Sequence, residues 1–157
     1  MVRSAQEAIK VARAQKTNVP STCQLNVRTW LDSPSVGDVD RDGDADAVDG
    51  WKSEPKKNQH TDKKPPLGMP VAWSGGRNGY GHRAISDGPD KNGVYFIIST
   101  DAPSSGKTSR VPLAWVEEQW GFKYLGWSDT IGGVPIPTAP VKPKPEPKPK
   151  TSRGKYV

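Results

Sequence analysis

Apolar residues recur at helical spacing in the first part of the chain. Residues 4–16 consist largely of helix formers, so we expect a helix that ends before Pro20. A second helix is expected to begin where Ser21 or Thr22 can cap it and to stop at Pro34. The positions that give these two helices an apolar side are Ala5, Ile9, Ala12, Leu25, Val27, Trp30 and Leu31.

After residue 69 the pattern changes to short runs rich in β-branched and aromatic residues, separated by turn residues. We expect a short helix over 114–121, closed by Gly121, among four strands. Helices followed by a run of strands are typical of an α+β domain with an antiparallel sheet. The expected strands lie at 69–74, 82–88, 93–101 and 122–129.

The composition separates a folded body from a tail. The last segment, 138–157, alternates proline with lysine, which favours an extended, polyproline-like linker, so we assign the domain to residues 1–137. The segment holds six basic residues and one acidic residue, and therefore five of the six net positive charges of the chain. The body is then close to neutral, so the basic isoelectric point does not indicate a nucleic-acid-binding surface.

The sequence shows neither the features of a targeting or membrane-spanning segment nor a pair of cysteines for a disulfide. The opening stretch "MVRSAQEAIKVARAQKTN" is amphipathic and has no apolar core, so we expect no signal peptide. No apolar run approaches the ~20 residues that span a membrane. A single cysteine excludes an internal disulfide, which fits folding in a reducing cytoplasm.

That cysteine, Cys23, falls where the second helix is expected to begin. The unpaired N–H groups and partial positive charge of a helix N-terminus lower the pKa of a thiol, so Cys23 is a candidate nucleophile. The alternative is a small buried side chain, which is common for a free cysteine.

A nucleophile needs a base, and the chain has two histidines. His60 lies in a lysine-rich loop, whereas His82 opens an expected strand directly after "GYG". If 82–86 pairs antiparallel with 94–101, Asp101 falls beside His82 and can orient the imidazole. Ser99 shares that face and is the alternative orienting residue. The alternative interpretation of Asp101 is that it is a turn residue before "APSSG".

The order cysteine, histidine and acidic residue resembles the CHAP family, the cysteine- and histidine-dependent amidohydrolases/peptidases. Cys23 and His82 are 59 residues apart, and Asp101 follows 19 residues later. The stretches "GMPVAWSGG", "GYGHRAIS" and "WGFKYLGW" look like lysin-type proteins encoded by phages of actinobacteria. Two features depart from the family: 67–70 reads Leu-Gly-Met-Pro where Pro-Gly-Asp is usual, and an aspartate-rich loop is inserted.

The resemblance implies a papain-like architecture, with N-terminal helices packed on a small antiparallel sheet. It also implies acyl transfer, in which Cys23 attacks an amide of bacterial peptidoglycan, His82 moves the proton and Asp101 holds the imidazole. The protein is then expected to be a monomer that is made in a host cytoplasm and acts at the cell wall. A separate chain could supply wall binding.

The inserted loop reads "DVDRDGDADAVDG", and its carboxylates repel one another unless a cation neutralises them. Its spacing follows a calcium loop, with glycine at the sixth position and aspartate in place of glutamate at the twelfth. It also resembles the calcium loops of dockerins. We therefore predict one structural Ca2+, held by Asp38, Asp40, Asp42, Asp44, Asp46 and Asp49.

Two other interpretations remain. The chain could be a non-catalytic, calcium-binding structural or wall-binding component of a virion that keeps a lysin-like fold. It could also be a cysteine hydrolase of the NlpC type, which has the same chemistry and differs in detail of fold. A Cys23 sulfur within hydrogen-bonding reach of His82 would favour a catalytic protein, whereas a buried Cys23 that faces away from His82 would favour a non-catalytic one.

Overall fold

The N-terminal part of the protein is helical, as the apolar pattern predicts. In the computed structural model, which describes residues 1–34 and 46–138, α1 spans Ala5–Ala14 and α2 spans Cys23–Leu31. Ser4 caps α1 through reciprocal hydrogen bonds with Glu7. Thr22 is the N-cap residue of α2, but its side chain makes no capping hydrogen bond.

Two shorter helices lie further along the chain. The α3 helix spans Ala47–Lys52, directly after the aspartate-rich loop, and α4 spans Trp115–Trp120. Gly121 ends α4 in the left-handed conformation, as expected from its sequence. Two 3-10 turns, η1 and η2, span Lys56–Asn58 and Arg77–Gly79.

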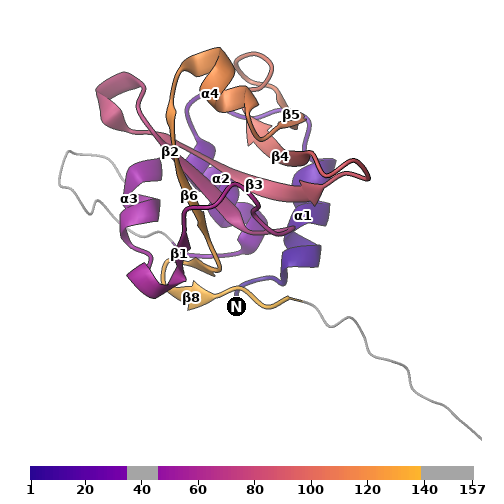
Figure 1. Cartoon of the computed structure of the whole chain (residues 1–157), viewed down its shortest axis with the longest axis vertical. Helices are drawn as coiled ribbons and strands as arrows, with labels where there is room; N and C mark the ends of the chain where they lie inside the picture. The colour runs from indigo at the N-terminus through magenta and orange to yellow at the C-terminus, as the bar shows by residue number, and fades with distance from the viewer. Residues whose placement is uncertain (35–45, 139–157) are drawn as a thin grey trace, which may run out of the picture.

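A six-stranded antiparallel sheet forms the centre of the molecule (Figure 1), so the α+β class with an antiparallel sheet is confirmed. The strand order is β1-β6-β2-β3-β4-β5, and β7 and β8 form a separate hairpin. The strands are β1 Gln59–His60, β2 Pro70–Ser74, β3 His82–Pro89, β4 Tyr95–Thr100, β5 Thr108–Pro112, β6 Lys123–Ser128, β7 Thr130–Ile131 and β8 Val134–Pro135.

The predicted pairing of the histidine strand with the strand after it is confirmed. Strands β3 and β4 run antiparallel, with Ile85 opposite Ile98 and Ser86 opposite Ile97. The edge strand β5 was not expected, because "SSGKTSRVPL" looks like a linker. It pairs with β4 along five residue positions.

The sheet carries a hydrophobic core on each face. One core joins α1 and α2 to the sheet through Trp30, Ile85 and Ile98, and the second contains Trp73, Ile97 and residues of α4. Neighbouring residues of β4 alternate between the two cores, as a pleated strand requires. The two N-terminal helices therefore cover one face, and α4 packs on the other.

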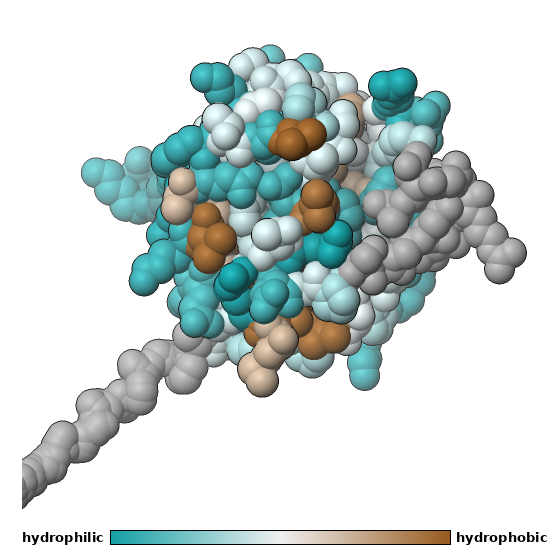
Figure 2. Space-filling view, turned by 180° about the vertical axis from the view of Figure 1, so that it is seen from behind, coloured by the Kyte–Doolittle hydropathy of each residue, from teal (hydrophilic) through white to brown (hydrophobic). Residues whose placement is uncertain are grey.

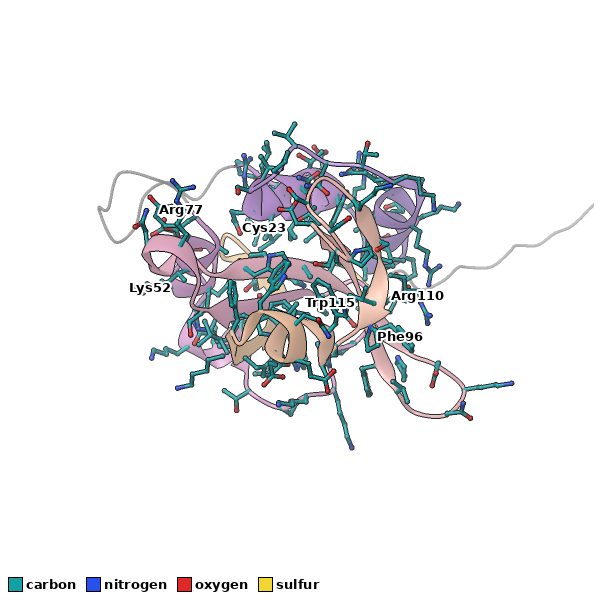
Figure 3. The ribbon with its side chains drawn as sticks, turned by 90° about the horizontal axis from the view of Figure 1, so that it is seen from above. Cys23, Lys52, Arg77, Phe96, Arg110 and Trp115 are labelled. Carbon is teal, nitrogen blue, oxygen red and sulfur yellow. The ribbon has the colours of Figure 1, made fainter. Side chains whose placement is uncertain are left out.

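The buried carboxylate of Asp87 joins three elements at one edge of the sheet. It accepts hydrogen bonds from Arg13 Nε of α1 (2.8 Å) and from Arg110 Nε of β5 (2.6 Å). The Arg110 guanidinium also covers the ring of Phe96, 3.8 Å from its centroid. Figure 3 shows Phe96 and Arg110 side by side, away from Cys23.

The surface in Figure 2 is mainly hydrophilic, and its hydrophobic residues are scattered as separate spots. Within residues 1–34 and 46–138, none of the helices has the length and apolar character needed to cross a bilayer. The expected Pro/Lys-rich tail lies outside the described residues from position 139 onward.

Replacing Asp87 tests the edge contact. We expect Asp87→Asn to lower the free energy of unfolding by about 1–3 kcal/mol, because two cations lose their shared partner. The measurement is urea unfolding at neutral pH. Glu118→Gln, an exposed carboxylate on α4, is the control and should change stability by less than about 0.5 kcal/mol. Equal stability of the parent and Asp87→Asn would contradict a stabilising role.

Candidate active site

The predicted nucleophile is the first residue of α2. Cys23 is a free thiol of intermediate exposure, and the turn before it places Ser21 at φ 64°. This turn is tied to the end of β4, because the Ser21 N–H donates to Asp101 Oδ2 at 3.0 Å. The helix N-terminus is thereby held at one end of the sheet.

Opposing influences act on the Cys23 thiol. Burial raises its pKa above the ordinary value. The backbone N–H groups of Arg83 and Gln24, and then the charge of Arg83, act in the opposite direction. Since burial dominates, the free thiol is the favoured form at neutral pH, and a base is needed to release the thiolate.

His82 is the first residue of β3 and is buried, with 3% of its surface exposed. Its ring makes an edge contact with Trp120 (centroids 4.8 Å apart) and a tilted contact with Trp73 (5.6 Å). Burial lowers the pKa of His82 to about 3, while the charge of Asp101 acts to raise it. The imidazole is therefore neutral at pH 7, as a general base must be.

Ser99 makes the hydrogen bond that orients this imidazole. Its Oγ lies 2.8 Å from His82 Nε2 and also donates to the Thr100 carbonyl at 3.0 Å. A hydroxyl has one hydrogen, so donation to Thr100 leaves Ser99 to accept from Nε2–H. The network therefore favours the tautomer with a free lone pair on Nδ1.

Asp101 reaches the same region but has other hydrogen-bond partners. It follows the last residue of β4 with φ 56°, so strand alternation no longer directs its side chain. Its carboxylate accepts from Asn18 Nδ2, Ser21 N and Gly106 N. The predicted contact with His82 is thus made by Ser99, and Asp101 acts on the imidazole through its charge.

The pKa of Asp101 reflects these contacts. Burial acts to raise it, but the hydrogen bonds from Gly106, Ser21 and Asn18, together with His82, outweigh burial and hold it below the ordinary value. Asp101 is therefore a carboxylate at neutral pH and fixes the turn that precedes Cys23.

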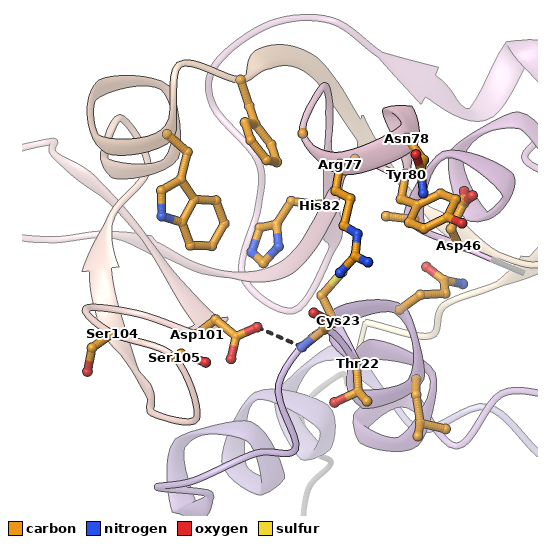
Figure 4. Close-up of a pocket in the computed structure, with 18 of the residues that line it drawn as sticks. Thr22, Cys23, Asp46, Arg77, Asn78, Tyr80, His82, Asp101, Ser104 and Ser105 are labelled. Carbon is orange, nitrogen blue, oxygen red and sulfur yellow. Dashed lines mark hydrogen bonds between the residues drawn. The ribbon is translucent and has the colours of Figure 1, made fainter. Parts of the chain in front are cut away.

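Cys23, His82 and Asp101 line one cavity of about 960 Å³ (Figure 4). Trp120 and Phe122 form an aromatic part of its wall, and Arg77 lies at its edge. Within the part of the chain that the structure describes, no hydrogen bond joins the Cys23 thiol to His82. The arrangement brings a thiol, a neutral imidazole and a carboxylate to one surface.

Two buried polar residues beside Cys23 were not predicted. Arg83 is 0% exposed and donates from Nη1 to Gln24 Oε1 at 3.4 Å, while its Nε and Nη2 have no hydrogen-bond partner among the described residues. Gln24 is 5% exposed, lines the cavity, and its Nε2 likewise has no partner there. An arginine within the apolar strand "HRAIS" is the one sequence signal of this pair.

Of the six predicted calcium ligands, the structure describes the last two, Asp46 and Asp49. Asp46 caps α3, accepting from Asp49 N (3.1 Å), and Asp49 accepts from Asp46 N (2.8 Å). The other four, Asp38, Asp40, Asp42 and Asp44, lie outside the described residues. Among residues 1–34 and 46–138 there is no group of three or more candidate ligands placed to hold a metal ion.

The capping geometry fits the calcium-loop numbering. The helix begins directly after the ninth loop position, and the side chain at the twelfth position, Asp49, is buried and reaches back toward the loop.

Comparison of the chain with models of protein families, with curated proteins and with solved structures found no match.

The depressed pKa of His82 predicts a pH-dependent stability. Between its folded value of about 3 and the ordinary value near 6.5, the unfolded chain binds a proton that the folded chain does not. Stability is therefore lost as pH falls from 6.5, by up to about 1.4 kcal/mol per pH unit. We expect a steeper loss in the parent than in His82→Gln, measured by urea unfolding between pH 6.5 and 4.5.

Ile98→Val, a substitution of a buried residue that removes no titratable group, is the control and should keep the slope of the parent. Comparing slopes rather than absolute stabilities removes the packing cost of each substitution. Identical slopes for the parent and His82→Gln would show that His82 is not buried in its neutral form.

Proposed function

We propose that the protein is a cysteine peptidase or amidase of the CHAP type, with a papain-like arrangement, that hydrolyses an amide bond of bacterial peptidoglycan. The observation that carries the proposal is the presence of a helix-terminal thiol and a buried, neutral imidazole in one cavity. The cavity volume is at the upper end of the ~300–1,000 Å³ typical of ligand sites, which suits a segment of peptide.

In the proposed reaction His82 acts as the general base. Its Nε2 is engaged with Ser99, which leaves Nδ1 to take the thiol proton of Cys23. The sulfur attacks the carbonyl carbon of the amide, and a carbon–sulfur bond forms. Because the thiol is the favoured ground state, proton transfer accompanies attack.

The carbonyl oxygen becomes an oxyanion that needs hydrogen-bond donors. The candidate donors on the cavity wall are the backbone N–H of Cys23, at the N-terminus of α2, and the side-chain amide nitrogen of Gln24. The imidazolium of His82 then protonates the leaving amine, and the carbon–nitrogen bond breaks. Water hydrolyses the thioester and restores the thiol.

The acidic loop is proposed to hold one Ca2+ through Asp38, Asp40, Asp42, Asp44, Asp46 and Asp49. The supporting observations are the ligand spacing and the position of α3, which starts where the ninth ligand ends the loop. When bound, the ion would neutralise the repelling carboxylates. Calcium outside cells is millimolar, so even a weak site would fill at the cell wall.

One alternative has its own support. The raised pKa of Cys23 and its lack of a hydrogen bond to His82 within the described residues favour a non-catalytic wall-binding or structural virion protein with the same fold. Such a protein would bind peptidoglycan without releasing fragments.

Replacing the nucleophile separates the two proposals. We expect Cys23→Ala and His82→Ala to abolish the loss of turbidity of a susceptible cell-wall suspension, because each removes one partner of the proton transfer. His60→Gln is the matched control, since His60 stacks on Trp127 and contacts Asp129 outside the cavity. It should retain the activity of the parent.

Mass spectrometry of the released fragments identifies the broken bond. A new carboxyl and amino group within a stem or bridge peptide indicates a peptidase, whereas a free lactyl carboxyl group together with the free amine of the first stem residue indicates an amidase. If Cys23→Ala clears the wall as fast as the parent while both remain folded, Cys23 is not the nucleophile.

Calcium is expected to stabilise the folded protein. A ligand at 100 times its dissociation constant adds about 2.7 kcal/mol to the free energy of unfolding. We therefore expect millimolar Ca2+ to raise the melting temperature and a chelator to lower it. Asp42→Asn should reduce the shift, and Glu118→Gln, which removes one charge on α4, should not. A melting temperature that is indifferent to calcium would remove the metal from the proposal.

A further inference from the structure

The turn before β3 holds an arginine at the edge of the proposed active-site cavity. Arg77 begins η2, and the turn closes through hydrogen bonds from Gly79 N to Gly76 O and from Gly81 N to Gly75 O. These glycines have positive φ, which suits residues without a side chain.

Close contacts fix the position of this turn on two sides. A Cβ on Gly76 would lie 2.5 Å from the Phe122 ring, and one on Gly81 would lie 2.4 Å from the Trp73 carbonyl oxygen. The Tyr80 carbonyl accepts from Val48 N at the start of α3. The backbone of Arg77 is therefore anchored to the cavity wall and to α3.

The side chain of Arg77 has no structural partner in the part of the chain that the structure describes. It is exposed and makes no hydrogen bond or ion pair with any described residue. Figure 4 shows it extending from the turn toward Cys23. Among the described residues that line the cavity, it is the one lysine or arginine.

The acidic side chains that line the cavity are engaged elsewhere. Asp101 accepts three N–H donors from Asn18, Ser21 and Gly106, and Asp46 caps α3. The imidazole of His82 is neutral at pH 7. Arg77 is thus a cation beside the nucleophile whose planar guanidinium is available to a carboxylate of a ligand.

We propose that Arg77 selects peptides that carry a free carboxylate, rather than a carboxamide, beside the amide bond presented to Cys23. This inference rests on the proposed function, because it assigns the class of substrate for the same cavity. In a γ-linked glutamate the α-carboxylate lies next to the chain amide, so a stem peptide with this linkage supplies such a group.

A matched pair of peptides tests the assignment without requiring turnover. The probes are L-Ala-γ-D-Glu-L-Lys-D-Ala with a C-terminal carboxamide and the same peptide with the glutamate α-carboxylate converted to carboxamide. Calorimetric binding is measured on the full-length Cys23→Ala protein. We expect the carboxylate peptide to bind about 10- to 100-fold more tightly, the range of a charged hydrogen-bonded contact, and the ratio to fall with added salt.

Arg77→Gln, in the same background, should reduce this ratio to near one and leave the affinity for the carboxamide peptide unchanged. Arg77→Lys should keep part of the preference. Lys123→Gln removes a cation of β6 that does not line the cavity, and it should keep the whole preference. Because Arg77 has no partner among the described residues, Arg77→Gln should melt at the temperature of the parent.

Equal affinity for the two peptides, a preference that survives Arg77→Gln, or binding of neither peptide would overturn the inference. Failure of the proposed function would give a different experimental result. In that case the parent releases no fragments from cell walls, while the affinity ratio of the two peptides on Cys23→Ala still reports on Arg77.

Discussion

The candidate site depends on the carboxylate of Asp101, which joins two segments 80 residues apart in the sequence. It binds the N–H of Ser21 before α2, the side chain of Asn18, and Gly106 in the loop after β4. In return, the Asp101 backbone N–H donates a hydrogen bond to Asn18 Oδ1. These contacts fix the N-terminus of α2 against the end of β4, and the position of Cys23 relative to the sheet follows from them.

Burial has opposite consequences for the imidazole and the thiol that are proposed to react. It keeps the imidazole of His82 neutral and able to accept a proton, but it also keeps the thiol of Cys23 protonated. A resting thiolate–imidazolium pair is therefore disfavoured. In the proposed reaction, the amide would therefore be attacked as the proton leaves, and the Arg83 charge and the backbone N–H groups of Arg83 and Gln24 would support negative charge on sulfur.

Local sequence pattern predicts most of the helices and strands but not the contacts between them. Alternation along β4 correctly places Ser99 on the side of His82, whereas Asp101 lies past the strand end with a positive φ, where alternation no longer applies. The polar strand β5 lacks the β-branched run that marks β4, and it forms because it pairs with β4. The contact of Gln24 with Arg83 depends on how α2 packs on β3, which no local pattern contains.

The helix α3 links the aspartate loop to the residues behind Cys23. It begins with the capping pair of Asp46 and Asp49, and it carries Gly50 against the Arg83 and Gln24 side chains. A Cβ at Gly50 would lie 2.2 Å from Arg83 Nη1 and 2.5 Å from Gln24 Oε1, so any side chain at this position would displace the ends of these two side chains. A change in the loop that displaces α3 must therefore disturb the polar pair beside the thiol. If the proposed Ca2+ binds the loop, this packing of α3 would connect its site to the residues beside Cys23.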